Sequence, residues 1–175
     1  MSSRSKILVC LSLFFMALAG LASSGIAGVI SLSPAAFRPI DSTSDNDRTW
    51  YAHETELYVP MSIDGPYFMA GVNLPNGVNI KKMTVYFTDM GTGVDDEVRV
   101  MLNRHSLSTG VVQQMAYACN HSSPALPYST SRQTKVDSTI SYKTISNSSY
   151  TYTVYVHFIM DCTDKVKFNG VKIEF

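Results

Sequence analysis

Beyond its first thirty residues, the chain alternates between apolar and polar positions with a period of two. In the segment 150–160 every even position is apolar or aromatic, and the odd positions are mostly Thr, Tyr and His. Because a β-strand places successive side chains on opposite faces, this segment predicts a long strand with one buried face and with His157 on the outer face. The same pattern recurs over 97–104 and 83–88, and more weakly over 67–74 and 111–118.

Turn-forming residues separate these segments. They occur at 74–77 (Leu-Pro-Asn-Gly), at 89–95 and at 146–149. Near the end of the chain, the apolar positions shift by one across Asn169 and Gly170. A β-bulge with Gly170 in a left-handed conformation would return all five apolar residues of this strand to one face: Val166, Phe168, Val171, Ile173 and Phe175.

Together these segments predict an all-β fold. With further strands at 30–32, 139–145 and the C-terminus, the count reaches about eight or nine. Several short strands separated by turns favour an antiparallel β-sandwich of jelly-roll or similar Greek-key type. The polar stretches 120–137 and 38–48 are predicted to be loops.

The N-terminus has the features of an export signal. Arg4 and Lys6 precede the apolar run 7–19, and small residues follow. We expect residues 1–27 to be a signal peptide, cleaved between 19 and 27, and residues 28–175 to form a single domain. An uncleaved anchor is the alternative, because weakly apolar sequence continues to Ile30. Both versions place the domain outside the cytoplasm, as a secreted, periplasmic or cell-surface protein.

Charge and motifs exclude several classes of function. The 175 residues carry 14 basic and 14 acidic side chains, without the basic excess of a nucleic-acid-binding protein. No second stretch approaches 18 apolar residues, so we expect no membrane contact beyond the signal segment. The sequence lacks a nucleophile elbow, a His-Glu-x-x-His motif and a phosphate loop. We therefore predict no catalytic residues and no enzymatic activity.

The mature chain contains two cysteines, Cys119 and Cys162. Exported proteins meet an oxidising environment, so we predict a disulfide between them. The alternative is a metal site or a reactive thiol, since His121 lies close to Cys119 in the sequence. A four-coordinate zinc site would need two more ligands that the sequence does not identify.

An acidic loop offers oxygen ligands for calcium. Asp41, Asp45 and Asp47 are candidate ligands, and a second acidic cluster lies at 95–97. The loop has neither the glycine nor the final glutamate of an EF-hand, so we interpret it as a solvated, turn-forming loop, with a calcium site as the alternative. We therefore predict no metal site and no cofactor, and calcium at this loop is the alternative.

Two adjacent aromatic residues are candidate binding residues. Trp50, the only tryptophan, is followed by Tyr51. Aromatic side chains can stack on sugars or fill a pocket of a partner protein. Packing into the core is the alternative for this pair.

One region of the chain resembles a group of exported proteins. Residues 72–80 (Val-Asn-Leu-Pro-Asn-Gly-Val-Asn-Ile) lead into 83–89 (Met-Thr-Val-Tyr-Phe-Thr-Asp). This is similar to short exported bacterial proteins of unknown role, in which a leucine-proline-x-glycine turn commonly leads into an aromatic strand that ends in Asp. The resemblance covers roughly residues 58–118. It implies a single β-sandwich domain and no particular functional residue.

These observations predict an exported, non-catalytic binding module. The expected partner is a glycan or a cell-surface protein, bound by loops at one end of the sandwich. One alternative is a structural subunit of an extracellular assembly, because a strand at each chain end could pair with a neighbour. A small outer-membrane β-barrel is the other alternative, since the length suits eight strands.

Overall fold

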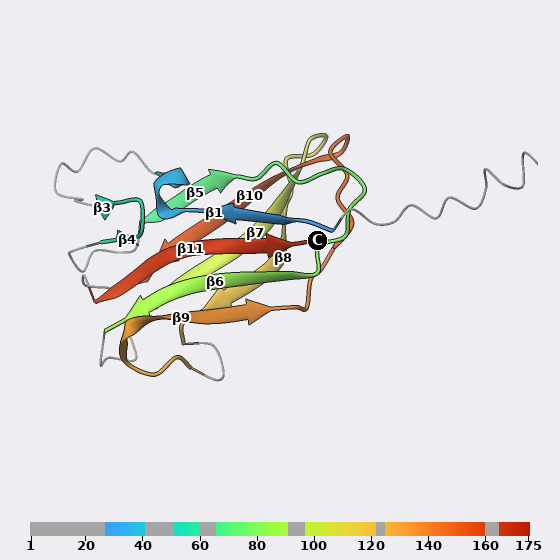
Figure 1. The fold of residues 1–175 in the computed structure, drawn as a ribbon. Coiled ribbons are helices and arrows are strands. Elements are labelled where there is room, and N and C mark those ends of the chain that lie inside the picture. Colours follow the sequence, from blue (N-terminus) through green and yellow to red (C-terminus); the bar gives the residue numbers. More distant parts are fainter. Residues whose placement is uncertain (1–26, 41–50, 60–65, 91–96, 122–124, 160–164) are drawn as a thin grey trace, which may run out of the picture.

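The computed structural model describes residues 27–40, 51–59, 66–90, 97–121, 125–159 and 165–175. These residues form strands and one short 3-10 turn, with no α-helix among them. The strands make two antiparallel sheets that lie face to face (Figure 1). The elements are β1 (Val29–Leu32), η1 (Pro34–Ala36), β2 (Arg38–Pro39), β3 (Tyr51–Ala52), β4 (Leu57–Tyr58), β5 (Tyr67–Gly71), β6 (Lys82–Asp89), β7 (Val98–Ser106), β8 (Val112–Cys119), β9 (Ser129–Asp137), β10 (Tyr150–Phe158) and β11 (Val166–Glu174).

The strand order is that of a jelly roll. One sheet has the order β3-β4-β11-β6-β9, with β1 also paired to β11, and the other has the order β2-β5-β10-β7-β8. From β5 onward each connection crosses from one sheet to the other, except the β7–β8 hairpin. The first and last strands, β1 and β11, are neighbours. The predicted antiparallel β-sandwich of jelly-roll type is therefore confirmed.

The core lies between the two sheets. Its largest side chains are phenylalanines, which meet edge to face: Phe37 and Phe168 have ring centroids 4.9 Å apart, and Phe68 and Phe158 have centroids 5.8 Å apart. Each of these four rings is almost completely buried. Apolar burial of this kind contributes about 25 cal/mol for each Å² removed from water, which makes it the main stabilising term of such a sandwich.

The predicted alternation decides which face of each strand is buried. Along β10, the even positions from 152 to 158 are buried, and the odd positions between them are half-buried. The same holds for Val98, Val100 and Leu102 of β7, all of which have no exposed surface. His157 lies on the outer face, as predicted.

The predicted bulge in the last strand is also confirmed. The register of β11 against β6 shifts between Phe168 and Gly170, and Gly170 has a φ of 130°. The five apolar side chains on both sides of the bulge are buried. A Cβ atom at Gly170 would lie 2.9 Å from the carbonyl oxygen of Leu32, so this position requires glycine for its conformation and for its space.

Two predictions about the middle of the chain are wrong. Residues 120–137 were expected to be a loop, but Ser129–Asp137 forms the nine-residue edge strand β9. Residues 139–145 were expected to be a strand, but they form a connection with a single bridge between Thr144 and Asn79. In addition, Arg38–Pro39 of the predicted loop 38–48 forms β2. Three two-residue strands bring the described total to eleven, above the predicted eight or nine.

The reason for the first error lies in the position of β9. As an edge strand it borders the open side of the sandwich, where its half-buried side chains meet polar groups. Asp137 Oδ2 accepts a hydrogen bond from the Tyr117 amide at 2.8 Å, and Gln133 Nε2 donates one to the Pro127 carbonyl oxygen at 2.8 Å. Polar inward positions of this kind protect a sheet edge and remove the apolar alternation from the sequence.

Candidate functional site

The outer face of the six-stranded sheet carries lysine and glutamate side chains that form salt bridges with one another. Lys82 and Lys172 each contact Glu174, with N–O distances of 3.1 and 2.7 Å. Lys167 contacts Glu56 at 3.0 Å. Exposed pairs of this type contribute little to stability, but they engage these three lysines with two glutamates.

The outer face of the five-stranded sheet has a different chemistry. One residue of each strand stands in a single row across it: Arg38, Met69, Tyr155, Met101 and Tyr117. Neighbouring strands are about 4.8 Å apart. Tyr155 and Tyr117 lie two strands apart, so their backbones are separated by about 9.6 Å. We use the name platform for Tyr67, Met69, Met101, Tyr155 and His157.

Two members of the platform form an exposed ring pair. Tyr67 and His157 are stacked, with ring centroids 3.8 Å apart and an interplanar angle of 11°. Tyr67 is 43% exposed and the neighbouring Met69 is 37% exposed. An exposed aromatic and thioether surface of this kind offers flat apolar contact area together with polar edges.

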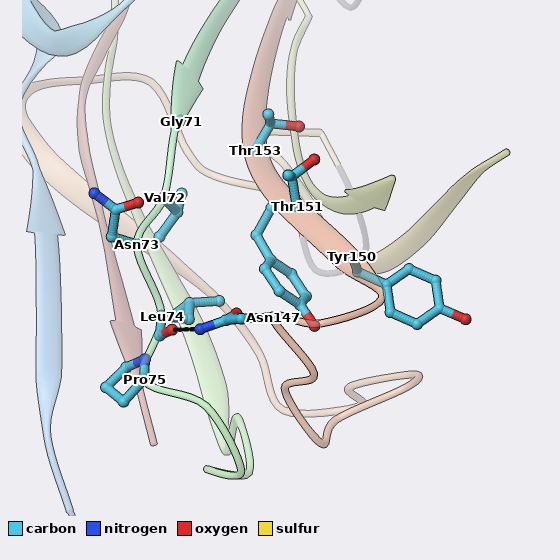
Figure 2. Close-up of a pocket in the computed structure, with 10 residues that line it drawn as sticks. Gly71, Val72, Asn73, Leu74, Pro75, Asn147, Tyr150, Thr151 and Thr153 are labelled. Carbon is cyan, nitrogen blue, oxygen red and sulfur yellow. Dashed lines mark hydrogen bonds between the residues drawn. The ribbon is translucent and has the colours of Figure 1, made fainter. Parts of the chain in front are cut away.

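A cleft of about 580 Å³ lies beside the platform. It lies between the end of β5 with its continuation to Pro75 and the start of β10, together with Asn147 (Figure 2). Its exposed lining residues include Gly71 and Thr151, which follow the same alternation along their strands as Met69 and Tyr155. The cleft therefore opens on the same face as the platform.

The walls of the cleft are held in place by Asn147. Its Nδ2 atom donates a hydrogen bond to the Leu74 carbonyl oxygen at 2.9 Å, as the dashed line in Figure 2 shows. Its backbone amide donates to Asn76 Oδ1 at 2.9 Å. Gly71 leaves the opposite side open, because a Cβ atom there would have no neighbour within 4 Å. The cleft is thus pre-formed, and apolar and aromatic side chains line it together with amide and hydroxyl groups.

His105 connects the cleft to the platform. Its Nε2 atom lies 2.6 Å from the hydroxyl oxygen of the cleft-lining Thr153, and its ring stacks on Tyr155 with centroids 5.9 Å apart. Burial lowers the pKa of His105 below its ordinary value. A neutral imidazole has one donor nitrogen and one acceptor nitrogen, so it can hydrogen-bond a hydroxyl group in either direction.

A second polar cluster lies at the opposite end of the sandwich. The fully buried Asn120 accepts a hydrogen bond from the Val98 amide and donates one to Asp89 Oδ2, both at 2.9 Å. Nearby, the bidentate contact with Arg99 lowers the pKa of Glu97. These groups satisfy one another, which indicates a structural role at this end.

The side chains of Cys119 and Tyr117, at the same end, also contact neighbours within the fold. The Sγ atom of Cys119 lies 2.9 Å from Glu97 Oε1. Burial, with a further contribution from the nearby Cys119, raises the pKa of Tyr117 to about 12. Both side chains sit at the β8 edge, away from the cleft.

Several predicted site residues lie outside the described residues. These are Trp50, Cys162 and the candidate calcium ligands Asp41, Asp45 and Asp47. The predicted signal peptide, 1–27, is also outside this part of the chain except for its last residue. Tyr51 begins β3, where its backbone pairs with Tyr58. No helix in the described part is long and apolar enough to cross a membrane.

Sequence reasoning missed the platform and the cleft. The signal for the platform was present, because Tyr155 and His157 fall on the outer positions of the strongest alternation. No sequence signal marked the cleft, since its two walls come from segments more than 70 residues apart that meet through the β5–β10 pairing and the Asn147–Leu74 hydrogen bond.

The fold is shared with a carbohydrate-binding module. The C-terminal CBM6 of LamC, a marine laminarinase from Zobellia galactanivorans, matches with a TM-score of 0.50 and 11% sequence identity, over 85% of this chain and 100% of that one.

Two other solved structures are similar at a lower score. The xylan-binding module CBM15 has a TM-score of 0.49 and 11% identity, over 85% of this chain and 97% of its own. The K1 cleaved adhesin domain of Lys-gingipain from Porphyromonas gingivalis W83 has a TM-score of 0.47 and 16% identity, over 83% and 97%. No protein-family model and no curated protein matches the sequence.

Proposed function

We propose that this chain is an exported, non-catalytic glycan-binding module, and that the glycan lies on the outer face of the five-stranded sheet. The observation that carries this proposal is the pre-formed cleft of about 580 Å³ on the same face as the exposed platform. Cleft and platform together offer aromatic stacking surface and fixed hydrogen-bonding groups, the two kinds of contact that sugar rings use.

The charge distribution supports this face over the opposite one. The six-stranded sheet presents paired lysines and glutamates, whereas the platform consists of aromatic, methionine and histidine side chains. A sugar offers hydroxyl groups and an apolar ring face, so it gains more from the second surface. The shared fold with the CBM6 module of LamC is in keeping with a glycan partner.

The proposal includes the compartment. Arg4 and Lys6 before an apolar run at 7–19 support an export signal. Extracellular and cell-surface glycans are accessible to a domain exported in this way. We therefore place the protein as secreted, in the periplasm or at the cell surface.

The proposal is tested by measuring the binding of the exported protein to a panel of soluble polysaccharides by isothermal titration calorimetry. We expect at least one polysaccharide to bind. Tyr155→Ala and Tyr67→Ala should each weaken that binding at least tenfold, which corresponds to about 1.4 kcal/mol.

Tyr86→Ala is the matched control. Tyr86 is half-buried like Tyr155, but it belongs to β6 and the opposite sheet. Its substitution should leave affinity unchanged. Absence of binding across the panel, or equal losses in Tyr86→Ala and Tyr155→Ala, would reject this site.

A further inference from the structure

Arg104, Tyr142 and Tyr150 form a stack at the end of the sandwich next to the cleft. The Cζ atom of Arg104 lies 3.8 Å from the centroid of the Tyr142 ring and 4.1 Å from that of the Tyr150 ring. Two rings cannot both lie this close to one face of a guanidinium group. The guanidinium is therefore held between the two rings, and we use the name arginine stack for these three residues.

The stack is assembled from three separate segments. Arg104 comes from β7, Tyr150 begins β10, and Tyr142 belongs to the connection after β9. Tyr142 has a φ of 50° and is the only non-glycine residue with positive φ in the described part of the chain. Strained backbone of this kind persists where the surroundings enforce it, and it is frequent at ligand sites. Tyr142 is also 50% exposed, so the stack reaches the surface.

The stack leaves the hydrogen-bond donors of Arg104 at its edge. A guanidinium carries five N–H groups in its own plane, and rings above and below do not cover them. The Nε–H donates to Gln113 Oε1 at 2.8 Å. Among the described residues no carboxylate pairs with Arg104, so four N–H donors and a positive charge remain available at a fixed position. Planar bidentate donors of this type suit a carboxylate or a sulfate.

Tyr150 links this cation to the cleft. It lines the cleft and at the same time stacks on Arg104. Arg104 pairs with the buried Tyr152, so the arginine stack lies on the core-facing side of the sheet at the end of the sandwich. A sugar chain that extends from the cleft past Tyr150 over this end would reach the guanidinium. We propose that the glycan bound in the cleft is acidic, and that an anionic oxygen group on one of its sugars, a carboxylate or a sulfate, accepts hydrogen bonds from Arg104. This inference rests on the proposed function.

The test uses acidic polysaccharides paired with neutral forms of the same backbone. The pairs are polygalacturonate with its methyl ester, glucuronoxylan with unsubstituted xylan, and carrageenan with its desulfated product. We expect at least one acidic member to bind at least tenfold more tightly than its neutral partner in calorimetry. The uronate and sulfate pairs identify which anionic group is recognised.

Substitutions at Arg104 separate recognition from general charge attraction. Arg104→Gln should abolish the preference for the acidic member and keep binding of the neutral one. Arg104→Lys keeps the charge without the planar donors, so it should retain only part of the preference for the acidic polysaccharide. Thermal unfolding of each variant checks that it folds. Arg132→Gln, at an exposed position of β9 in the other sheet, removes the same charge and should leave the preference intact.

The outcomes distinguish this inference from the proposed function. If neutral polysaccharides bind and no acidic member binds more tightly, the arginine stack is a structural clamp and this inference alone fails. Equal losses in Arg132→Gln and Arg104→Gln would show nonspecific attraction and would also overturn it. If no member of the panel binds, the proposed function fails as well.

Discussion

The Nε2 atom of His105 on β7 lies 2.6 Å from the Oγ1 atom of Thr153 on β10. The two residues are diagonal neighbours, because Thr153 pairs directly with Asn103. The contact joins the platform to the cleft, since the His105 ring also stacks on Tyr155 and Thr153 lines the cleft. Its strength depends on the protonation state of the imidazole.

Stability should fall at mildly acidic pH because of His105. Its pKa in the folded protein lies below the ordinary value of 6.5, since burial disfavours the charged ring. The unfolded chain therefore takes up this proton first. The contribution of His105 to the free energy of unfolding is complete above about pH 6.5. It is lost as the pH falls from there through the pKa of the folded state.

Urea unfolding at pH 7.5 and pH 5.5 measures this effect. His105→Gln keeps a hydrogen-bonding side chain but does not titrate. It should therefore lose less stability than the wild type between the two pH values. An identical loss in both proteins would mean that His105 is not the group responsible.

Gly170→Ala should destabilise the fold by about 1–3 kcal/mol, because an alanine there adopts a strained φ and its Cβ meets the Leu32 carbonyl oxygen at 2.9 Å. Thermal unfolding followed by circular dichroism measures the change. Gly71→Ala is the control, since a Cβ there has no neighbour within 4 Å. Similar melting temperatures for both variants would contradict this account of the bulge.

Asn120→Ala should cost roughly 2–4 kcal/mol. The substitution leaves the buried Val98 amide and one oxygen of the buried Asp89 without this partner, and an unsatisfied buried group costs about 1–3 kcal/mol. Asn79→Ala removes an exposed hydrogen bond to Thr144 and should change stability by no more than about 0.5 kcal/mol. Denaturant unfolding of the two variants provides the comparison.

We propose that Cys119 and Cys162 form a disulfide in the exported protein. Cys119 lies opposite Arg99, and Phe158, four residues before Cys162, lies opposite Val98. The ends of β8 and β10 therefore flank β7 at the same end of the sheet. Alkylation of the denatured, unreduced protein should label neither cysteine, and reduction should cost about 2–4 kcal/mol of stability. Labelling of both thiols before reduction would exclude the bond.

Local pattern determined much of the fold. The alternation along 150–160 predicted which side chains of β10 are buried, because a strand offers only two faces. The shift across Asn169 and Gly170 predicted the bulge, because the buried face must be kept on both sides of it. Neither inference needed knowledge of the partner strand.

The alternation of apolar and polar positions did not predict strand β9, because burial there depends on residues from other parts of the chain. The inward positions of β9 include Asp137, which accepts its hydrogen bond from the Tyr117 amide of β8, a strand of the other sheet that becomes a neighbour only when the two sheet edges come together. Such a strand lacks apolar alternation and looks like a loop in the sequence.

The sequence by itself determined the class of fold, the faces of the main strands and the position of the bulge, because these follow from properties of consecutive residues. Only the tertiary structure decided the cleft and the arginine stack. Leu74 meets Asn147, and Arg104 meets Tyr142 and Tyr150, across connections that cross between the sheets. The geometry of such a site is set by strand order and register, which no single segment of the chain specifies.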